Sequence, residues 1–82
     1  MKQLNNQFGA AVRRAREQRG WSQEILADKA DLNRSYLGEV ERGTAMPSLA
    51  TIFKLANAFD TNMATLISEC ELRSEVDSIS SS

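Results

Sequence analysis

The chain has 82 residues, of which 41% are hydrophobic and 26% charged, and its formal net charge is −1. This length suits one domain with one modest core, and no apolar run approaches the roughly 18 residues of a membrane span. A single cysteine, Cys70, and no histidine exclude an internal disulfide, the usual zinc sites and the side chain best suited to proton transfer near neutrality. The first residues also lack the apolar run of a secretory signal, so we expect a cytoplasmic protein. From the residue types that are absent, we expect no catalytic activity, metal or cofactor.

Two helices are predicted in the first part of the chain. Residues 4–19 end before Gly20, a residue type common just after a helix, and carry an apolar stripe at helical spacing formed by Leu4, Phe8, Ala11, Val12 and Ala15. Ser22 is a strong N-cap candidate for a second helix over residues 23–30, whose inner side carries Leu26, Ala27 and Ala30.

A third helix is predicted at Arg34–Arg42, after a turn formed by Asp31 and Leu32. Asn33 is expected to cap this helix and Gly43 to end it. Its apolar positions are Leu37 and Val40, with Tyr36 beside them.

Two further helices follow the loop at residues 44–47. Ser48 caps the fourth, whose expected inward-facing residues are Leu49, Ile52, Phe53, Leu55, Ala56 and Phe59. The fifth begins near Asn62 or Met63 and carries Met63, Leu66, Ile67 and Cys70 at positions i, i+3, i+4 and i+7. We expect residues 1–68 to form one domain and residues 69–82 a C-terminal extension with a frayed end.

The extension has an apolar stripe of its own. If the fifth helix continued through it, Leu72, Val76 and Ile79 would lie on the side opposite Met63. A single fold could not cover both stripes, so either the helix breaks around Cys70–Ser74 or the second stripe meets another subunit. The plain alternative is a loosely packed tail.

The segment from Ser22 to Gly43 is the most informative part of the sequence. Two short helices joined by a short turn pack at a steep angle and need small residues where they meet, which Ala27 and Ala30 supply. The later of the two, the third helix, is expected to project polar residues outward, namely Arg34, Ser35, Gly38 and Glu39. A helix with a protruding polar N-terminus fits the major groove of DNA.

These features resemble the helix-turn-helix domain of lambdoid phage repressors and of the xenobiotic-response-element (XRE) regulators. The resemblance covers roughly residues 8–68 and is carried by Gln23, Leu26-Ala27, Leu32, Leu37, Val40, Glu41-Arg42-Gly43, Pro47-Ser48-Leu49, Ile52 and Leu55-Ala56. Within the family, Asn33-Arg34-Ser35-Tyr36 followed by Glu41-Arg42-Gly43 looks most like the small controller proteins of restriction–modification systems. The resemblance implies an all-α, five-helix, lambda-repressor-like bundle that binds DNA at the nucleoid.

The resemblance also implies a set of DNA-binding residues: Arg13, Gln23, Asn33, Arg34, Ser35, Tyr36, Glu39, Arg42 and Thr44. Arg34 is the expected base reader, because a guanidinium pairs bidentately with O6 and N7 of guanine; the alternative is a phosphate contact without base reading. Ser35 and Glu39 are expected to read or exclude neighbouring bases, although Glu39 is equally suited to pairing with a nearby arginine. Tyr36 either contacts the DNA or packs within the domain.

The remaining DNA contacts implied by the resemblance are to the phosphate backbone. Gln23 would donate its amide to a phosphate at the N-terminus of the second helix. Arg13, Arg42 and Thr44 would contact other phosphates; for Arg13 an ordinary solvated basic face is the alternative.

Two other pairs of residues have expected roles. The resemblance implies a partly buried ion pair between Arg16 and Glu41, which would hold the first helix against the third. Glu24 and Asp28 resemble an acidic patch that contacts RNA polymerase, and the alternative is two solvated carboxylates. The sequence departs from the family at Asp31 and Asp60, where glycine in a left-handed conformation is common.

Together these features predict a transcriptional regulator that binds a pseudo-palindromic operator as a C2 homodimer, with its third helices about 34 Å apart. The expected dimer surface lies on the fifth helix, with neighbouring parts of the fourth, and comprises Met63, Leu66, Ile67, Leu72 and Val76. The alternative is that the stripe on the fifth helix only packs into the core of its own chain. The alternative function is a protein-interaction adaptor or antitoxin-type partner that keeps the fold but reads no bases.

Overall fold

A computed structural model describes the backbone of residues 2–68 and the side chains of residues 6–68. The expectations for Leu4, Cys70, Leu72, Val76 and Ile79 therefore lie outside the side chains described. The chain folds into the helices α1 (Lys2–Gln18), α2 (Gln23–Ala30), α3 (Arg34–Arg42) and α4 (Leu49–Ala58), followed by a helical segment at residues 63–68. The all-α, lambda-repressor-like prediction is confirmed.

The helices α2 and α3 begin and end where the sequence predicts, because their caps are local, whereas α1 covers residues 2–18 and not the predicted 4–19. The side chains of Ser22 and Ser48 accept hydrogen bonds from the backbone N–H groups of Ile25 and Thr51, respectively. Gly20 and Gly43, which follow α1 and α3, have φ of 71° and 78°. L residues avoid this left-handed region, so glycine is the residue type best suited to these two turns.

Asp31 and Asp60 take the same backbone conformation without being glycine. Their φ values are 55° and 59°, and Asp31 ends α2 with its N–H pointing back to the carbonyl of Asp28. Aspartate tolerates the left-handed region better than most residues. The two departures from the family are therefore compatible with the turns that the fold requires.

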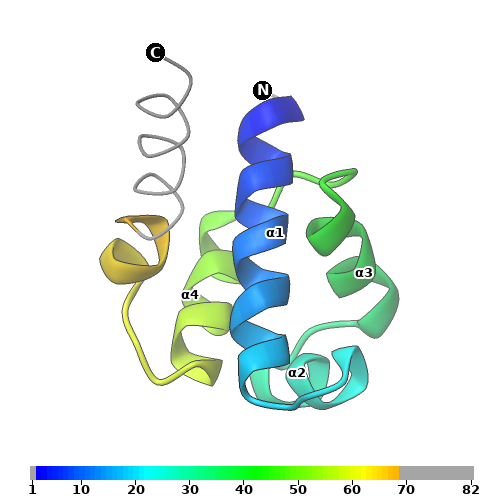
Figure 1. Cartoon of the computed structure of the whole chain (residues 1–82), viewed down its shortest axis with the longest axis vertical. Coiled ribbons are helices and arrows are strands. Elements are labelled where there is room, and N and C mark those ends of the chain that lie inside the picture. The colour runs from blue at the N-terminus through cyan, green and yellow to red at the C-terminus, as the bar shows by residue number, and fades with distance from the viewer. Residues whose placement is uncertain (1, 69–82) are drawn as a thin grey trace.

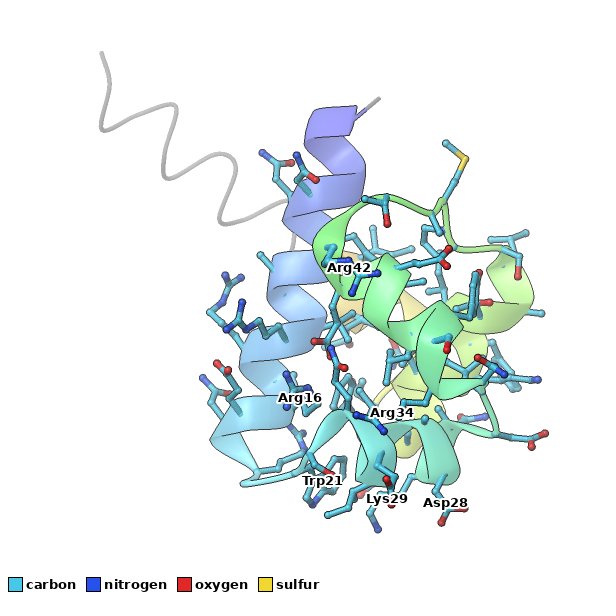
Figure 2. The ribbon with its side chains drawn as sticks, turned by 90° about the vertical axis from the view of Figure 1, so that its right-hand side faces the viewer. Arg16, Trp21, Asp28, Lys29, Arg34 and Arg42 are labelled. Atoms are coloured by element: carbon cyan, nitrogen blue, oxygen red, sulfur yellow. The ribbon has the colours of Figure 1, made fainter. Side chains whose placement is uncertain are left out.

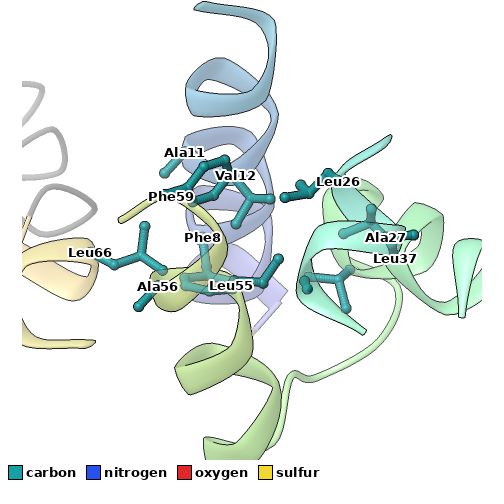
Figure 3. Close-up of a cluster of buried hydrophobic side chains, with 12 residues drawn as sticks. Phe8, Ala11, Val12, Leu26, Ala27, Leu37, Leu55, Ala56, Phe59 and Leu66 are labelled. Carbon is teal, nitrogen blue, oxygen red and sulfur yellow. The ribbon is translucent and has the colours of Figure 1, made fainter. Parts of the chain in front are cut away.

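The helices enclose a single hydrophobic core. Figure 1 shows α1 in the middle of the bundle, with α3 on one side of it and α4 and the 63–68 segment on the other, while α2 closes the lower end. The core contains buried side chains from every helix, many of them labelled in Figure 3: Phe8, Ala11, Val12, Leu26, Ala27, Ala30, Leu37, Val40, Leu55, Ala56, Phe59 and Leu66.

The approach of α1 to α3 depends on a glycine that the helical pattern does not single out. A Cβ built on Gly9 would lie 2.5 Å from the Glu41 carbonyl oxygen, well inside van der Waals contact. Gly9 therefore permits the backbone of α1 to pass directly against the C-terminal end of α3.

The fourth helix differs from the sequence expectation on one of its sides. Leu55, Ala56 and Phe59 are buried as expected, but Leu49 is 72% exposed and Phe53 55% exposed. The prediction that these two residues face inward is wrong. Leu49 and Phe53 lie at the edge of the apolar side of α4, outside the part that packs into the core.

Among residues 2–68 no helix has both the length and the apolar character to cross a bilayer.

Candidate nucleic-acid interface

The helices α2 and α3 are joined by a tight turn whose geometry is set by local hydrogen bonds. The Leu32 N–H bonds the Ala27 carbonyl oxygen at 2.8 Å. The Asn33 side-chain oxygen then accepts from the N–H groups of Ser35, at 2.8 Å, and Tyr36, at 3.2 Å. Asn33 thus caps α3 and fixes the direction in which its first turn leaves the domain.

The first turn of α3 stands outside the core. Arg34 and Ser35 are exposed, and so is Glu39 one turn later. No ion pair involves Glu39 among the residues described, so the alternative of an arginine partner finds no support there. Three polar side chains on this edge of α3 are accessible to a ligand.

Gly38 does not belong to this exposed edge, and the expectation that it faces outward is wrong. It is buried because neighbouring side chains lie over it. A Cβ at this position would lie 3.1 Å from Arg42 Nη1 and 3.8 Å from Gln23 Oε1. The missing side chain leaves room for the Arg42 guanidinium to lie back along α3, and Figure 2 shows Arg42 and Arg34 on the same face of the molecule.

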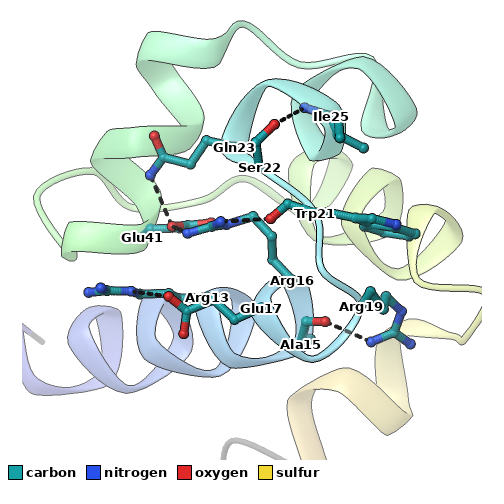
Figure 4. Close-up of polar contacts among 10 residues, drawn as sticks. All are labelled: Arg13, Ala15, Arg16, Glu17, Arg19, Trp21, Ser22, Gln23, Ile25 and Glu41. Carbon is teal, nitrogen blue, oxygen red and sulfur yellow. Dashed lines mark hydrogen bonds and ion pairs between the residues drawn. The ribbon is translucent and has the colours of Figure 1, made fainter.

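A buried ion pair between α1 and α3 lies behind the exposed edge of α3. Arg16 donates from Nε to Glu41 Oε2 at 2.8 Å and from Nη2 to Glu41 Oε1 at 3.1 Å, and its Nη1 donates to the Trp21 carbonyl oxygen at 2.9 Å (Figure 4). The Arg16 and Glu41 side chains are only 12% and 3% exposed. Hydrogen bonding to Glu41 raises the pKa of the Arg16 guanidinium, although burial acts in the opposite direction. The Arg16 guanidinium therefore remains charged, and its two hydrogen bonds to Glu41 hold α1 against α3.

Gln23 is half-buried and takes part in the hydrogen-bond network of the ion pair. Its Nε2 donates to Glu41 Oε1 at 3.0 Å (Figure 4), so the amide expected to contact a phosphate is engaged within the domain. An amide nitrogen carries two hydrogens. One N–H can remain bonded to Glu41 while the other donates to a phosphate. The phosphate contact stays a prediction.

Arg34 has an acidic neighbour on α2. Its Nη1 lies 3.8 Å from Glu24 Oε2, and the side chains of Arg34 and Glu24 are 68% and 79% exposed. Arg13 forms a similar surface pair with Glu17, at 3.2 Å, one turn along α1. Both arginines are thus accessible, and each has a carboxylate beside it.

Tyr36 points away from the solvent and toward α4. Its hydroxyl lies 3.1 Å from Thr51 Oγ1, which in turn lies 3.0 Å from Ser48 Oγ. Thr51 is buried and Tyr36 is half-buried. This geometry favours packing within the domain for Tyr36 and ties α3 to the cap of α4.

The C-terminal end of α3 carries the remaining expected phosphate ligands. Arg42 is exposed, and so is Thr44, whose Oγ1 and N–H both donate to the Glu39 carbonyl oxygen. These bonds fix Thr44 against the end of the helix with its side chain at the surface.

The outer face of α2 is acidic with one apolar residue in it. Glu24, Ile25, Asp28 and Lys29 line a shallow surface hollow. Lys29 Nζ lies 4.9 Å from the centroid of the Trp21 ring, a favourable cation–π contact. Glu24 and Asp28 are both exposed and available to a basic partner.

The expected dimer surface needs correction at one residue. Leu66 is buried in the core of its own chain, where a second copy cannot contact it, so its assignment to the dimer surface is wrong. Met63 and Ile67 are half-buried. The large exposed apolar side chains that come before this segment in the sequence are Met46, Leu49 and Phe53. Leu49 and Phe53 have i, i+4 spacing on α4, and this spacing was the sequence signal that could have identified them as an exposed apolar pair.

The fold and the exposed first turn of α3 define a helix-turn-helix protein. A model of the helix-turn-helix family HTH_3 matches residues 12–66, and the chain belongs to this family. The control protein C.BamHI of Bacillus amyloliquefaciens is 40% identical over 70 residues, covering 78% of this chain and 86% of that protein. The transcriptional regulator SutR of Escherichia coli K12 is 32% identical over 68 residues, covering 83% of this chain.

Solved structures extend the same relationship. The restriction–modification controller protein C.AhdI of Aeromonas hydrophila superposes with a TM-score of 0.73 at 45% identity, covering 76% of this chain and 94% of that chain. Controller proteins are thus among the homologues of this chain. The relatives differ in length, since the match spans only 38% of SutR.

Proposed function

We propose that this chain binds double-stranded DNA sequence-specifically and regulates transcription. The observation that carries the proposal is the exposure of Arg34 and Ser35 on the first turn of α3, with Arg42 on the same face. A guanidinium at the N-terminus of a protruding helix suits O6 and N7 of guanine in the major groove. Such a regulator acts in the cytoplasm, where the DNA is.

We further propose that the chain binds a pseudo-palindromic operator as a homodimer. One short helix offers few base contacts, and a two-fold dimer doubles them while placing two reading helices about 34 Å apart. The exposed apolar side chains of Leu49 and Phe53, together with half-buried Met63 and Ile67, support a dimer surface on α4 and the 63–68 segment. Burying them against a second copy would remove apolar area from water.

The relatives named control proteins support a controller-like role, with an operator in the promoter region of the protein's own gene. Occupancy of such a site represses by blocking RNA polymerase. If the site lies upstream of a promoter, the carboxylates of Glu24 and Asp28 are suited to contact a basic surface of the polymerase, which would activate transcription.

Selection of bound sites from random duplexes by the full chain tests the proposal. We expect enrichment of a two-fold-related motif containing guanine at the position that Arg34 reads. Arg34→Ala should relax the preference at that position by about 5- to 150-fold, the equivalent of about 1–3 kcal/mol.

Arg42→Ala provides the matched comparison, because a phosphate contact carries no sequence information. It should weaken binding to every duplex alike and leave the selected motif unchanged. An unaltered motif after Arg34→Ala would contradict the role of Arg34. Tight binding to a protein without any enriched duplex would instead favour the adaptor function.

A further inference from the structure

The proposed base reader has a carboxylate beside it, which is costly on a surface that meets DNA. Arg34 Nη1 and Glu24 Oε2 are 3.8 Å apart, and both side chains are mostly exposed. Glu24 lies in the first turn of α2 and Arg34 in the first turn of α3, so the turn between the helices brings these opposite charges together. An exposed pair of this kind contributes little to folding stability.

The carboxylate nevertheless affects what Arg34 can bind. Non-specific DNA binding depends on lysine and arginine neutralising phosphates, and a carboxylate beside the arginine opposes this. A guanidinium has five N–H donors in a rigid plane. With Nη1 turned toward Glu24, other donors of Arg34 remain available to the two acceptors of guanine.

We infer that Glu24 is a specificity-determining positioning residue, which orients Arg34 toward guanine and disfavours its contact with phosphates. This inference rests on the proposed DNA-binding function. On a matching site, Arg34 can bind guanine and retain Glu24. On a non-matching site, a phosphate that approaches Arg34 also approaches the Glu24 carboxylate, and the two anions repel each other. Guanine carries no net charge, so non-specific binding is weakened more than specific binding.

The neighbouring charges provide a control. Asp28 lies one turn further along the exposed side of α2, and Glu39 lies on α3. Among the residues described, neither carboxylate forms an ion pair. Asp28→Asn therefore removes one exposed carboxylate from α2 without altering the surroundings of Arg34.

The experiment compares the full-length wild type, Glu24→Gln and Asp28→Asn by fluorescence anisotropy, on the selected operator and on a scrambled duplex of equal length and composition. We expect Glu24→Gln to tighten binding to the scrambled duplex about fivefold and to the operator less than about twofold. Its salt dependence on the scrambled duplex should steepen by about 0.9 per protomer, because Arg34 gains a phosphate. Asp28→Asn should change both affinities by a similar small factor.

The same substitution in an Arg34→Ala background separates positioning from simple charge repulsion. There, Glu24→Gln should no longer change the ratio of the two affinities more than Asp28→Asn does. Persistence of the full effect without Arg34, or equal tightening on both duplexes in its presence, would overturn the inference. A wild type that does not prefer its operator would instead overturn the proposed function itself. Equal melting temperatures verify that all variants are folded.

Discussion

Arg16 on α1 and Glu41 on α3 form a two-pronged ion pair, with Nε–Oε2 and Nη2–Oε1 distances of 2.8 and 3.1 Å. The remaining donor of Arg16 binds the Trp21 carbonyl oxygen, and Gln23 donates to Glu41. Among the residues described, no buried side-chain polar atom lacks a partner. The pair thus connects α1, the start of α2 and the reading helix, so the position of α3 depends on it.

Removing one partner of this pair should be strongly destabilising. Arg16→Ala leaves the Glu41 carboxylate buried without its counter-ion, and we expect a loss of about 3–5 kcal/mol in the free energy of unfolding, measured by urea denaturation. Replacing both residues by apolar ones, in Arg16→Met with Glu41→Leu, should cost less because no unpaired charge remains. A single substitution that costs under about 1 kcal/mol would show that the pair is solvated.

The pKa of Arg16 predicts how this contribution depends on pH. A base whose pKa is raised on folding stabilises the protein below its unfolded-state pKa and loses that contribution only as pH rises through the folded value. Both values for Arg16 lie in the strongly alkaline range. The stability difference between wild type and the double variant, Arg16→Met with Glu41→Leu, should therefore be constant from about pH 7 to pH 9, and a decline over that range would contradict the prediction.

Gly9 and Gly38, each inside a helix, should respond oppositely to alanine. Gly9→Ala places a methyl group against the backbone carbonyl of Glu41, which cannot move without displacing α3, and we expect a loss of about 1–3 kcal/mol. Gly38→Ala meets only the mobile end of Arg42 and should be neutral or stabilising by up to about 1 kcal/mol. Thermal unfolding measures both. Equal effects would show that helix propensity, and not the packing of α1 on α3, dominates.

Asn33 should have two separable roles. Asn33→Ala removes the cap of α3 and should lower stability by about 1 kcal/mol. Asn33→Ser retains a capping oxygen but lacks the amide, so we expect near-wild-type stability with weaker operator binding. Operator affinity equal to that of the wild type in Asn33→Ser would restrict the residue to its capping role.

The exposed apolar side of α4 should control the oligomeric state. Phe53→Glu places a charge in the proposed dimer surface, and sedimentation equilibrium should then report a monomer and a weaker complex with the two-fold operator. Ile25→Glu, on the outer face of α2, also replaces an exposed apolar residue and should leave the dimer intact. If both variants sediment as the wild type does, the dimer surface lies elsewhere.

Tyr36→Phe should uncouple α3 from the cap of α4. The hydroxyl is within hydrogen-bonding distance of Thr51, which also contacts Ser48. Losing one such bond costs about 0.5–1.5 kcal/mol of unfolding free energy, and differential scanning calorimetry measures it. No change in stability would indicate that the Tyr36 hydroxyl is directed elsewhere in solution.

Local features of the sequence were sufficient to predict the helices. Ser22, Asn33, Ser48 and Gly43 act on backbone groups within a few residues, so the bounds of α2, α3 and α4 follow from the chain alone. The exposed edge of α3 was also predicted from the chain alone, because helical periodicity places Ser35 opposite Leu37 and Val40, and Arg34 is the first residue of the helix.

The tertiary structure decided the relationships that depend on how helices pack. Leu49 and Phe53 lie at the edge of the apolar stripe of α4, and only the position of the neighbouring helices determines that they stay exposed. Likewise, the proximity of Glu24 to Arg34 depends on the angle between α2 and α3. Helical periodicity fixes directions around one axis, whereas burial and contacts between helices depend on the relative placement of several axes, which no local pattern encodes.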